Sequence, residues 1–303
     1  MSSAYMQGEL LFLHAITSLH PGCGTALGTV DLPVQRERHT QWPTIPGSAL
    51  KGVMRDNCRR AVGAGSDADP AIVTVFGPPT SGADKHAGAI SFTDARILAF
   101  PVRSLRGVFA WVTCPAALDR FNRDAAMAGK QVALSVPAIK SSTGCLVGGA
   151  DLVTGNKEVV LEEFCFNVEG DASPVARAIA PLMLADEPTR QRFLSHFAIL
   201  ADDQFNYFVQ HATEVVARIG LNHETKTVSD KALFYQEFLP AETMFYSVVI
   251  ASPSRNNGKA MNPAEVIDYL RTALFTGDGL PVIQVGGDET TGKGLCALSM
   301  TEK

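Results

Sequence analysis

The hydrophobic pattern of the chain predicts strands and helices in alternation. Residues 8–18, GELLFLHAITS, form an apolar run that predicts a buried first strand. The other segments with strand signals are 89–100, 107–114, 159–168, 280–285 and 295–300. Helical spacing of apolar residues predicts helices over 48–61, 115–129, 174–195 and 263–276. Strands divided by helices in this way favour an α+β fold with a ferredoxin-like core.

Four stretches interrupt this pattern. Residues 20–46 are rich in Gly and Pro, and a loop of that length is functional or disordered; its apolar content favours function. Residues 63–88 resemble a surface excursion, and residues 140–157 a turn-rich insertion. Residues 219–234 have the pattern of an extended arm. With no repeat of fixed period, we expect one domain over 1–303 that carries these insertions.

Composition and charge narrow the class of protein. The chain is 46% hydrophobic and 19% charged, which is ordinary for a globular protein in water. No apolar run reaches the roughly 20 residues of a membrane span, and the first strand lacks the basic region of a signal peptide. We therefore expect a cytoplasmic protein with no membrane partner. The six cysteines are scattered, which indicates free thiols and excludes a zinc knuckle or a CxxC redox pair.

Positive charge gathers locally in a chain whose formal net charge is −5. Between residues 34 and 60 there are six Lys and Arg residues against two acidic ones. Within the helix predicted from its cap Ser48, the cations Lys51, Arg55 and Arg59 follow an i, i+4, i+8 stripe. A solvated helix face is the ordinary reading of such a stripe. This one begins at a helix N-terminus, where backbone N–H groups and the helix dipole favour phosphate.

The loop GGDETTGKG near the end of the chain nearly matches the phosphate-binding pattern GxxxxGK[ST]. Gly294 stands where a Ser or Thr would hold Mg²⁺, and only nine residues follow, too few for a nucleotide-binding fold. We therefore exclude an NTPase. The loop is either a tight strand-to-strand turn or a backbone nest in which Gly286, Gly287, Gly292 and Lys293 meet RNA phosphates.

Three strings together resemble one family. HPGCGTALGTVDLPVQRERHTQWPTIPGSALKGVMR, VARIGLNHETKTVSDKALFYQEFLPAET and the terminal GGDETTGKGL are similar to the backbone subunit of type III-B (Cmr) CRISPR effector complexes. That subunit belongs to the RAMP superfamily, so the resemblance implies a modified ferredoxin-like (RRM-like) fold with inserted hairpins and loops. The strings span the chain from end to end.

The resemblance also implies a function. Several copies stack head to tail along a guide RNA, in company with other Cmr subunits, and a thumb-like hairpin on each copy interrupts the guide–target duplex. We expect the thumb within 213–240, with 140–157 as the competing candidate. Each copy cuts the target RNA once. The aspartate of the VDxP string is catalytic in the family, which is Asp31 here. Cleavage there depends on a divalent metal, Mg²⁺ or Mn²⁺, and leaves a cyclic phosphate or 3′-phosphate.

The chemistry of such a cut suggests further candidates. The 2′-OH of RNA attacks the adjacent phosphate in line, and Asp31 either removes its proton or holds the metal. Glu237 is a second candidate carboxylate, and His20 orients a phosphate or acts as an acid; a surface strand residue and a turn residue are their plain alternatives. The candidate RNA contacts are Arg36, Arg38, Ser48, Lys51, Arg55, Gly286, Gly287, Gly292 and Lys293.

Two other functions stay open at this point. The chain could be a purely structural RNA-binding subunit, in which case Asp31 is a turn residue. It could also be a RAMP ribonuclease that processes precursor guides, an activity that usually uses a histidine-centred site with little need for metal. Asp31→Ala in an assembled complex separates the first alternative from catalysis, and activity in EDTA tests the second.

Overall fold

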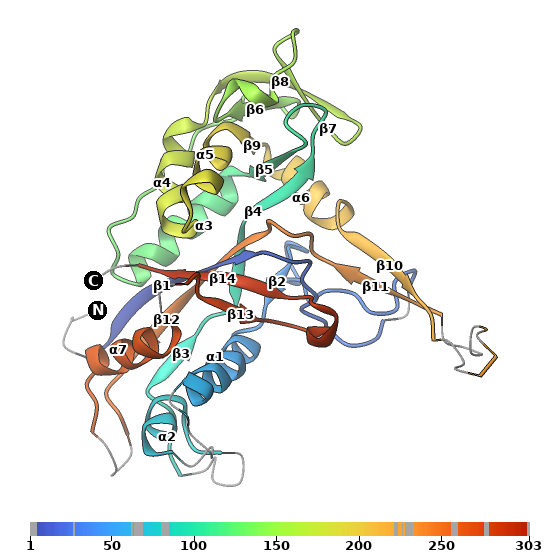
Figure 1. Ribbon diagram of the computed structural model, residues 1–303. Coiled ribbons are helices and arrows are strands. Elements are labelled where there is room, and N and C mark those ends of the chain that lie inside the picture. The colour runs from blue at the N-terminus through green and yellow to red at the C-terminus, as the bar shows by residue number, and fades with distance from the viewer. Residues whose placement is uncertain are drawn as a thin grey trace.

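The computed structural model describes residues 5–26, 28–61, 63, 69–79, 85–220, 224–225, 227, 233–255, 260–275 and 279–301 (Figure 1). Its strands are β1 (Gln7–Ala15), β2 (Thr44–Ile45), β3 (Ile90–Phe92), β4 (Ala95–Arg103), β5 (Phe109–Thr113), β6 (Gly144–Val147), β7 (Glu158–Leu161), β8 (Phe164–Asp171), β9 (Phe197–Leu200), β10 (Glu214–Arg218), β11 (Phe234–Phe238), β12 (Met244–Ala251), β13 (Val282–Gln284) and β14 (Leu295–Met300). Its α-helices are α1 (Gly47–Ala61), α2 (Pro70–Phe76), α3 (Pro115–Met127), α4 (Ser173–Met183), α5 (Glu187–His196), α6 (Asp202–His211) and α7 (Pro263–Leu274). The short 3₁₀ turns are η2 (Ala150–Leu152) and η3 (Glu289–Thr291).

One twelve-stranded mixed sheet organises the described chain, in the order β13-β14-β1-β12-β4-β5-β9-β6-β8-β7, with β2 beside β4 and β3 beside β12. The first strand, β1, lies between β12 and the last strand, β14, so the first and last strands of the chain are neighbours in the sheet (Figure 1). The strands β10 and β11 pair with each other in a separate two-stranded hairpin that projects from the body.

Alternation along the strands produces two hydrophobic cores, one on each face of the sheet. In β1, Leu11 and Leu13 pack in the core that α1, α2 and α7 cover. Leu10 and Phe12, which point the other way, pack in the core that α3, α4 and α5 cover. Helices thus cover both faces of the large sheet (Figure 1). The candidate site residues therefore lie on loops beside the separate β10–β11 hairpin.

Two segments predicted as single strands are each broken in two. Residues 89–100 contain β3 and β4, because Asp94 between them turns away to bind the first N–H of α1, at 2.7 Å from the nitrogen of Gly47. Residues 159–168 contain the end of β7 and most of β8, joined by a tight turn in which Glu162 has φ +49°. Both breaks depend on turns that the apolar pattern does not reveal.

Other boundaries also differ from the sequence prediction. The helix predicted over 174–195 is two helices, α4 and α5, because Asp186 caps a new first turn by accepting from the amide of Thr189. The turn-rich segment 140–157 contributes the buried strand β6, which pairs with both β8 and β9. The excursion 63–88 contains α2 in its described part.

The remaining expectations can be placed briefly. Within 213–240 the chain forms the β10–β11 hairpin, while most of the extended arm 219–234 lies outside the described residues. The assignment of this hairpin as the thumb, and the division into one domain with insertions, stay predictions. The six cysteines are free, four of them buried, as the sequence indicated. Among the described residues, no helix has both the length and the apolar character that crossing a bilayer requires.

Candidate active site and RNA-binding surface

Asp31 lies where the long first loop runs beside the β10–β11 hairpin. Its Oδ2 accepts a hydrogen bond from the backbone N–H of Tyr235 at 2.7 Å, and its own N–H donates to the carbonyl of Tyr235 at 3.1 Å. The side chain is half-buried. No described residue is recorded as a hydrogen-bond partner of its other oxygen, Oδ1. One carboxylate oxygen is therefore fixed by the fold, and the other is left for chemistry.

Backbone pairing holds the whole loop against β11. Leu32 bridges Gln236 in the parallel sense, and Leu19 bridges Leu239 in the antiparallel sense. The N–H of Glu237 donates to the carbonyl of Leu32 at 3.0 Å. Because residues 19 and 32 pair with β11 and the residue just beyond it, residues 20 and 31 are brought to the same segment of the chain.

Glu237 is buried beneath this loop and is not a surface strand residue. Its carboxylate accepts from the N–H of Val34 at 2.9 Å, the hydroxyl of Thr213 at 2.9 Å and the guanidinium of Arg36 at 2.6 Å. Arg36 also donates to the carbonyls of Gln41 and Val209. Glu237 and Arg36 therefore form an ion pair that holds the loop in place. Their roles in catalysis and in RNA contact stay predictions.

His20 is buried against the ring of Phe238, at 5.5 Å between ring centroids. Its Nδ1 lies 2.7 Å from the carbonyl oxygen of Glu237. Since a carbonyl oxygen only accepts, Nδ1 must carry the proton, and Nε2 holds the lone pair when the ring is neutral. A Cβ at Gly22 would lie 2.7 Å from Nε2, so a glycine there keeps that nitrogen uncovered. His20 can thus accept a proton at Nε2, and it can donate one there only when the ring is charged.

The glycine-rich loop sits directly on this histidine. The N–H of Gly287 donates to the carbonyl of His20 at 3.0 Å, and a Cβ at Gly286 would lie 2.3 Å from that oxygen. Gly286 and Gly292 have φ of +83° and +74°, a region that glycine adopts without strain. The loop connects β13 to β14, so the turn reading is correct, and the phosphate-binding reading stays a prediction.

Two cations and the glycine-rich loop meet on Phe238. The Arg218 guanidinium carbon lies 5.4 Å from the ring centroid, and the Lys293 Nζ lies 5.0 Å from it. Asp288 of the loop accepts from Gln236 at 2.6 Å and pairs with Arg218 at 3.1 Å. Arg218 could not be predicted from the sequence, because its partner Asp288 is 70 residues away in the chain and no local motif joins them.

The predicted cation stripe of α1 has mixed partners. Arg55 donates to the carbonyl of Gly77, and Arg59 pairs with Asp56 at 2.6 Å. Lys51 is half-buried with no recorded partner among the described residues, and burial together with the charge of Arg55 lowers its pKa. Lys51 is therefore the member of the stripe that the fold leaves for an external anion.

The predicted cap of α1 is wrong. Ser48 lies inside the first turn, because the helix begins at Gly47 and the N–H of Leu50 donates to the carbonyl of Pro46. The carboxylate of Asp94 accepts the first free N–H instead. This negative charge already occupies part of the helix N-terminus, while Ser48 itself is exposed.

A second ion pair fixes the loop beyond Arg36. Both oxygens of Glu37 accept from Arg120, at 2.6 and 2.8 Å, and the guanidinium of Arg120 lies 4.7 Å from the ring centroid of Trp42. Burial raises the pKa of Glu37, but the hydrogen bonds from Arg120 and Thr40 and the positive charge of Arg120 together lower it more, so the pKa lies below its ordinary value. Arg38, in the same loop, is exposed.

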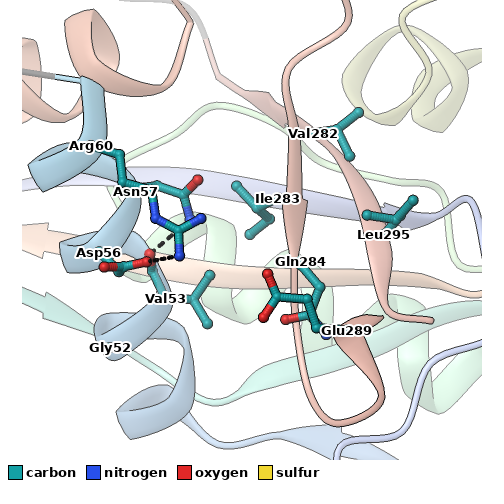
Figure 2. A pocket seen from close by; sticks show the side chains of 10 residues that line it. All are labelled: Gly52, Val53, Asp56, Asn57, Arg60, Val282, Ile283, Gln284, Glu289 and Leu295. Atoms are coloured by element: carbon teal, nitrogen blue, oxygen red, sulfur yellow. Dashed lines mark hydrogen bonds and ion pairs between the residues drawn. The ribbon is translucent and has the colours of Figure 1, made fainter. Parts of the chain in front are cut away.

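A groove of about 350 Å³ separates α1 from the β13–β14 hairpin (Figure 2). Figure 2 shows Val53 and Asn57 of α1 on one side of the groove and Ile283 of the hairpin on the other, with Glu289 of the glycine-rich loop at one end. The groove therefore lies between α1 and the glycine-rich loop, but none of the candidate RNA contacts lines it.

The donor set around Asp31 suits a metal only in part. Among the described residues there is no group of three or more His, Cys, Asp or Glu side chains able to enclose an ion. Glu37, the acidic residue next along the chain, and the candidate Glu237 are both paired with arginines. Mg²⁺ commonly takes one carboxylate and completes its shell with water and substrate phosphates. The residues present fit that open arrangement and do not form an all-protein metal cage.

A family model and a curated relative each match nearly the whole chain. The RAMP superfamily model matches residues 12–297. The CRISPR system Cmr endoribonuclease Cmr4 of Pyrococcus furiosus is 37% identical over 300 residues, which cover 98% of this chain and 97% of that protein.

Solved structures give the same result for the fold. Oligomeric Cmr4 from Pyrococcus furiosus has a TM-score of 0.72 at 30% identity, covering 98% of this chain and 99% of that one. A type III-B Cmr-beta complex bound to cognate target RNA contains the same fold, with a TM-score of 0.71 at 21% identity and 98% of both chains covered. The α+β RAMP fold expected from the sequence is confirmed. The chain belongs to the RAMP superfamily and, within it, to the Cmr4 family of CRISPR proteins.

Proposed function

We propose that this chain is the guide-RNA-binding backbone subunit of a type III-B (Cmr) effector complex, and that each copy is an endoribonuclease that cuts complementary target RNA at Asp31. The name of the Pyrococcus relative supports RNA cleavage, and its oligomeric structure supports stacking of copies. The observation that carries the proposal is the carboxylate of Asp31, held by one oxygen at the hairpin edge with the other unpartnered among described residues.

The residues around Asp31 fit in-line cleavage. The 2′-oxygen of the target bonds to the adjacent phosphorus, the bond from phosphorus to the 5′-oxygen breaks, and a 2′,3′-cyclic phosphate and a 5′-hydroxyl result. The free oxygen of Asp31 accepts the 2′-OH proton directly or orients the group that does. In its charged form His20 donates a proton from Nε2 to the leaving 5′-oxygen, which becomes the 5′-hydroxyl. Lys293 and Arg218 offset the negative charge that develops on the phosphate.

Metal dependence is part of the proposal. Asp31 would hold Mg²⁺ or Mn²⁺ through its free oxygen, with phosphate oxygens and water as the other ligands. When bound, the cation supplies charge neutralisation and makes the 2′-OH more acidic. Full activity in EDTA would leave Asp31 as the base alone.

The guide contacts are proposed from exposed or unpartnered groups. The side chains of Lys51 and Arg38 have no recorded partner in the described part of the chain, and the glycine-rich loop carries the half-buried Lys293. Contacts of this kind position RNA without reading its sequence, so pairing between guide and target supplies specificity. Head-to-tail stacking of copies, together with other Cmr subunits, then builds a filament, because such an interface need not close. The cytoplasmic location expected from the sequence remains a prediction.

The test is cleavage of a labelled target by an assembled complex in which every copy carries Asp31→Ala, with Asp119→Ala, an exposed carboxylate on α3, as the matched control. We expect cutting to disappear in the Asp31 variant while target binding persists, and the control to cut normally. We also expect EDTA to stop the wild-type complex and Mg²⁺ to restore it. Normal cutting by the Asp31 variant would show that the catalytic group lies elsewhere, and full activity in EDTA would remove the metal from the mechanism.

A further inference from the structure

The hairpin carries an exposed aromatic side chain at the very residue that holds Asp31. Tyr235 gives its N–H to the Asp31 carboxylate and receives the N–H groups of Asp31 and Leu32 on its carbonyl. Two backbone–backbone hydrogen bonds and one to the Asp31 carboxylate thus join the backbone of residue 235 to the loop that carries Asp31. Any group that binds the Tyr235 side chain is placed beside Asp31.

The side chain itself is left uncovered. Tyr235 is 41% exposed, and the residue paired with it across the hairpin is Ala217, which is too small to cover a ring. Side chains alternate along β11, so Gln236 and Phe238 point toward the glycine-rich loop. Glu237, on the same face as Tyr235, lies buried under the first loop, where it binds the N–H of Val34. On this face the first loop therefore covers Glu237 and leaves Tyr235 exposed. Among the described residues, no hydrogen bond or ring contact of its side chain is recorded.

An exposed ring next to a cutting group has a clear use in RNA chemistry. In-line attack requires a nucleotide splayed out of its helical stack, since regular stacking keeps the 2′-oxygen away from the line opposite the leaving oxygen. A base that leaves its stack is commonly held on an aromatic face, and stacking tolerates any base. Sequence tolerance is what an enzyme guided by pairing needs.

We propose that Tyr235 is a positioning residue for the cut: its ring stacks on the base of the target nucleotide beside the scissile phosphate and holds that nucleotide splayed against Asp31. This inference rests on the proposed function, because it assumes that Asp31 is the cutting group. The ring acts by its aromatic face, and the phenol oxygen takes no part.

The experiment uses assembled complexes and a target with 2-aminopurine at the nucleotide beside the cut. Single-turnover cleavage is measured for Tyr235→Phe, Tyr235→Leu and the control Val216→Ala, whose side chain is 40% exposed on the other face of the hairpin. We expect Tyr235→Leu to lower the rate about 5- to 150-fold, the equivalent of one lost base stack, with target binding unchanged. Tyr235→Phe and the control are expected to cut normally.

The fluorescence is measured in complexes that also carry Asp31→Asn, which keeps an acceptor for the Tyr235 N–H and prevents cutting. We expect the 2-aminopurine signal to be quenched with Tyr235 or Phe at position 235 and to rise with Leu. An unchanged signal and an unchanged rate in Tyr235→Leu would overturn the inference, as would equal losses in the Phe and Leu variants. If Asp31→Asn still cuts, the proposed function fails, while the fluorescence still decides whether the base stacks on residue 235.

Discussion

Replacing Glu237 separates a structural role for this carboxylate from a catalytic one. Its side chain is 8% exposed and accepts hydrogen bonds from a backbone amide, a hydroxyl and the guanidinium of Arg36, whose side chain is 15% exposed. Removing one partner of a buried ion pair costs about 3–5 kcal/mol. Losing only the charge of such a hydrogen bond costs about 1.5–3 kcal/mol. We therefore expect Glu237→Ala to lower the free energy of unfolding by the first amount and Glu237→Gln by the second.

The assay is urea unfolding of the isolated chain at one fixed concentration, followed by Mg²⁺ titration of cleavage in the assembled complex. Glu214→Ala is the matched control, since this half-buried glutamate on the same hairpin accepts one hydroxyl, that of Ser18, and is expected to cost about 1 kcal/mol. A structural Glu237 leaves the Mg²⁺ midpoint of Glu237→Gln unchanged. The reasoning is refuted if Glu237→Gln unfolds like the wild type and needs much more Mg²⁺, because Glu237 would then be a metal ligand.

Three further predictions follow from single contacts. Lys51→Met is expected to weaken guide-RNA binding for all guide sequences and to reduce the slope of the logarithm of the binding constant against the logarithm of salt concentration by about 0.7. The slope is measured by RNA titration in increasing NaCl, and the control Arg36→Met should destabilise the chain and leave the slope unchanged. Because the pKa of Glu37 is lowered in the folded state, its ionised carboxylate stabilises the fold above the ordinary pKa of 4.5, and this stabilisation is lost as the pH falls through the pKa of the folded state. Glu37→Gln should therefore flatten the decline of the free energy of unfolding below pH 4.5. An equally steep decline in the variant would count against the ion pair. Gly286→Ala should cost more than about 1 kcal/mol in urea unfolding, since φ is +83° and a backbone oxygen lies 2.3 Å from the new Cβ; a neutral result would mean that the loop rearranges freely.

Strong local patterns allowed the sequence to predict much of the fold. The first strand, the final helix and the end of α1 at Ala61 follow from apolar spacing over ten residues or so. The breaks at Asp94 and Asp186 were missed because each depends on a carboxylate that caps a helix. Asp94 caps a helix 47 positions back in the chain, which no window along the sequence can detect.

The site shows the same division. The family resemblance singled out Asp31 and a motif singled out the glycine-rich loop, but the partners of both were not predicted. Asp31 binds a residue 204 positions away, and Arg36 binds Glu237 at a separation of 201. Arg36 and Arg55 were predicted to contact RNA because a cation in a basic stretch looks free in sequence. Folding gave both of them internal partners, and it brought the unpredicted Arg218 to the glycine-rich loop.

The central claim is that every copy cuts with its own Asp31. The most direct measurement is the cleavage rate at each cut position in complexes reconstituted from mixtures of wild-type and Asp31→Asn subunits. The account predicts that cutting at every backbone position falls in proportion to the fraction of wild-type subunits and vanishes in the pure variant, with target binding constant. Cuts that persist at the same positions in the pure variant would contradict it.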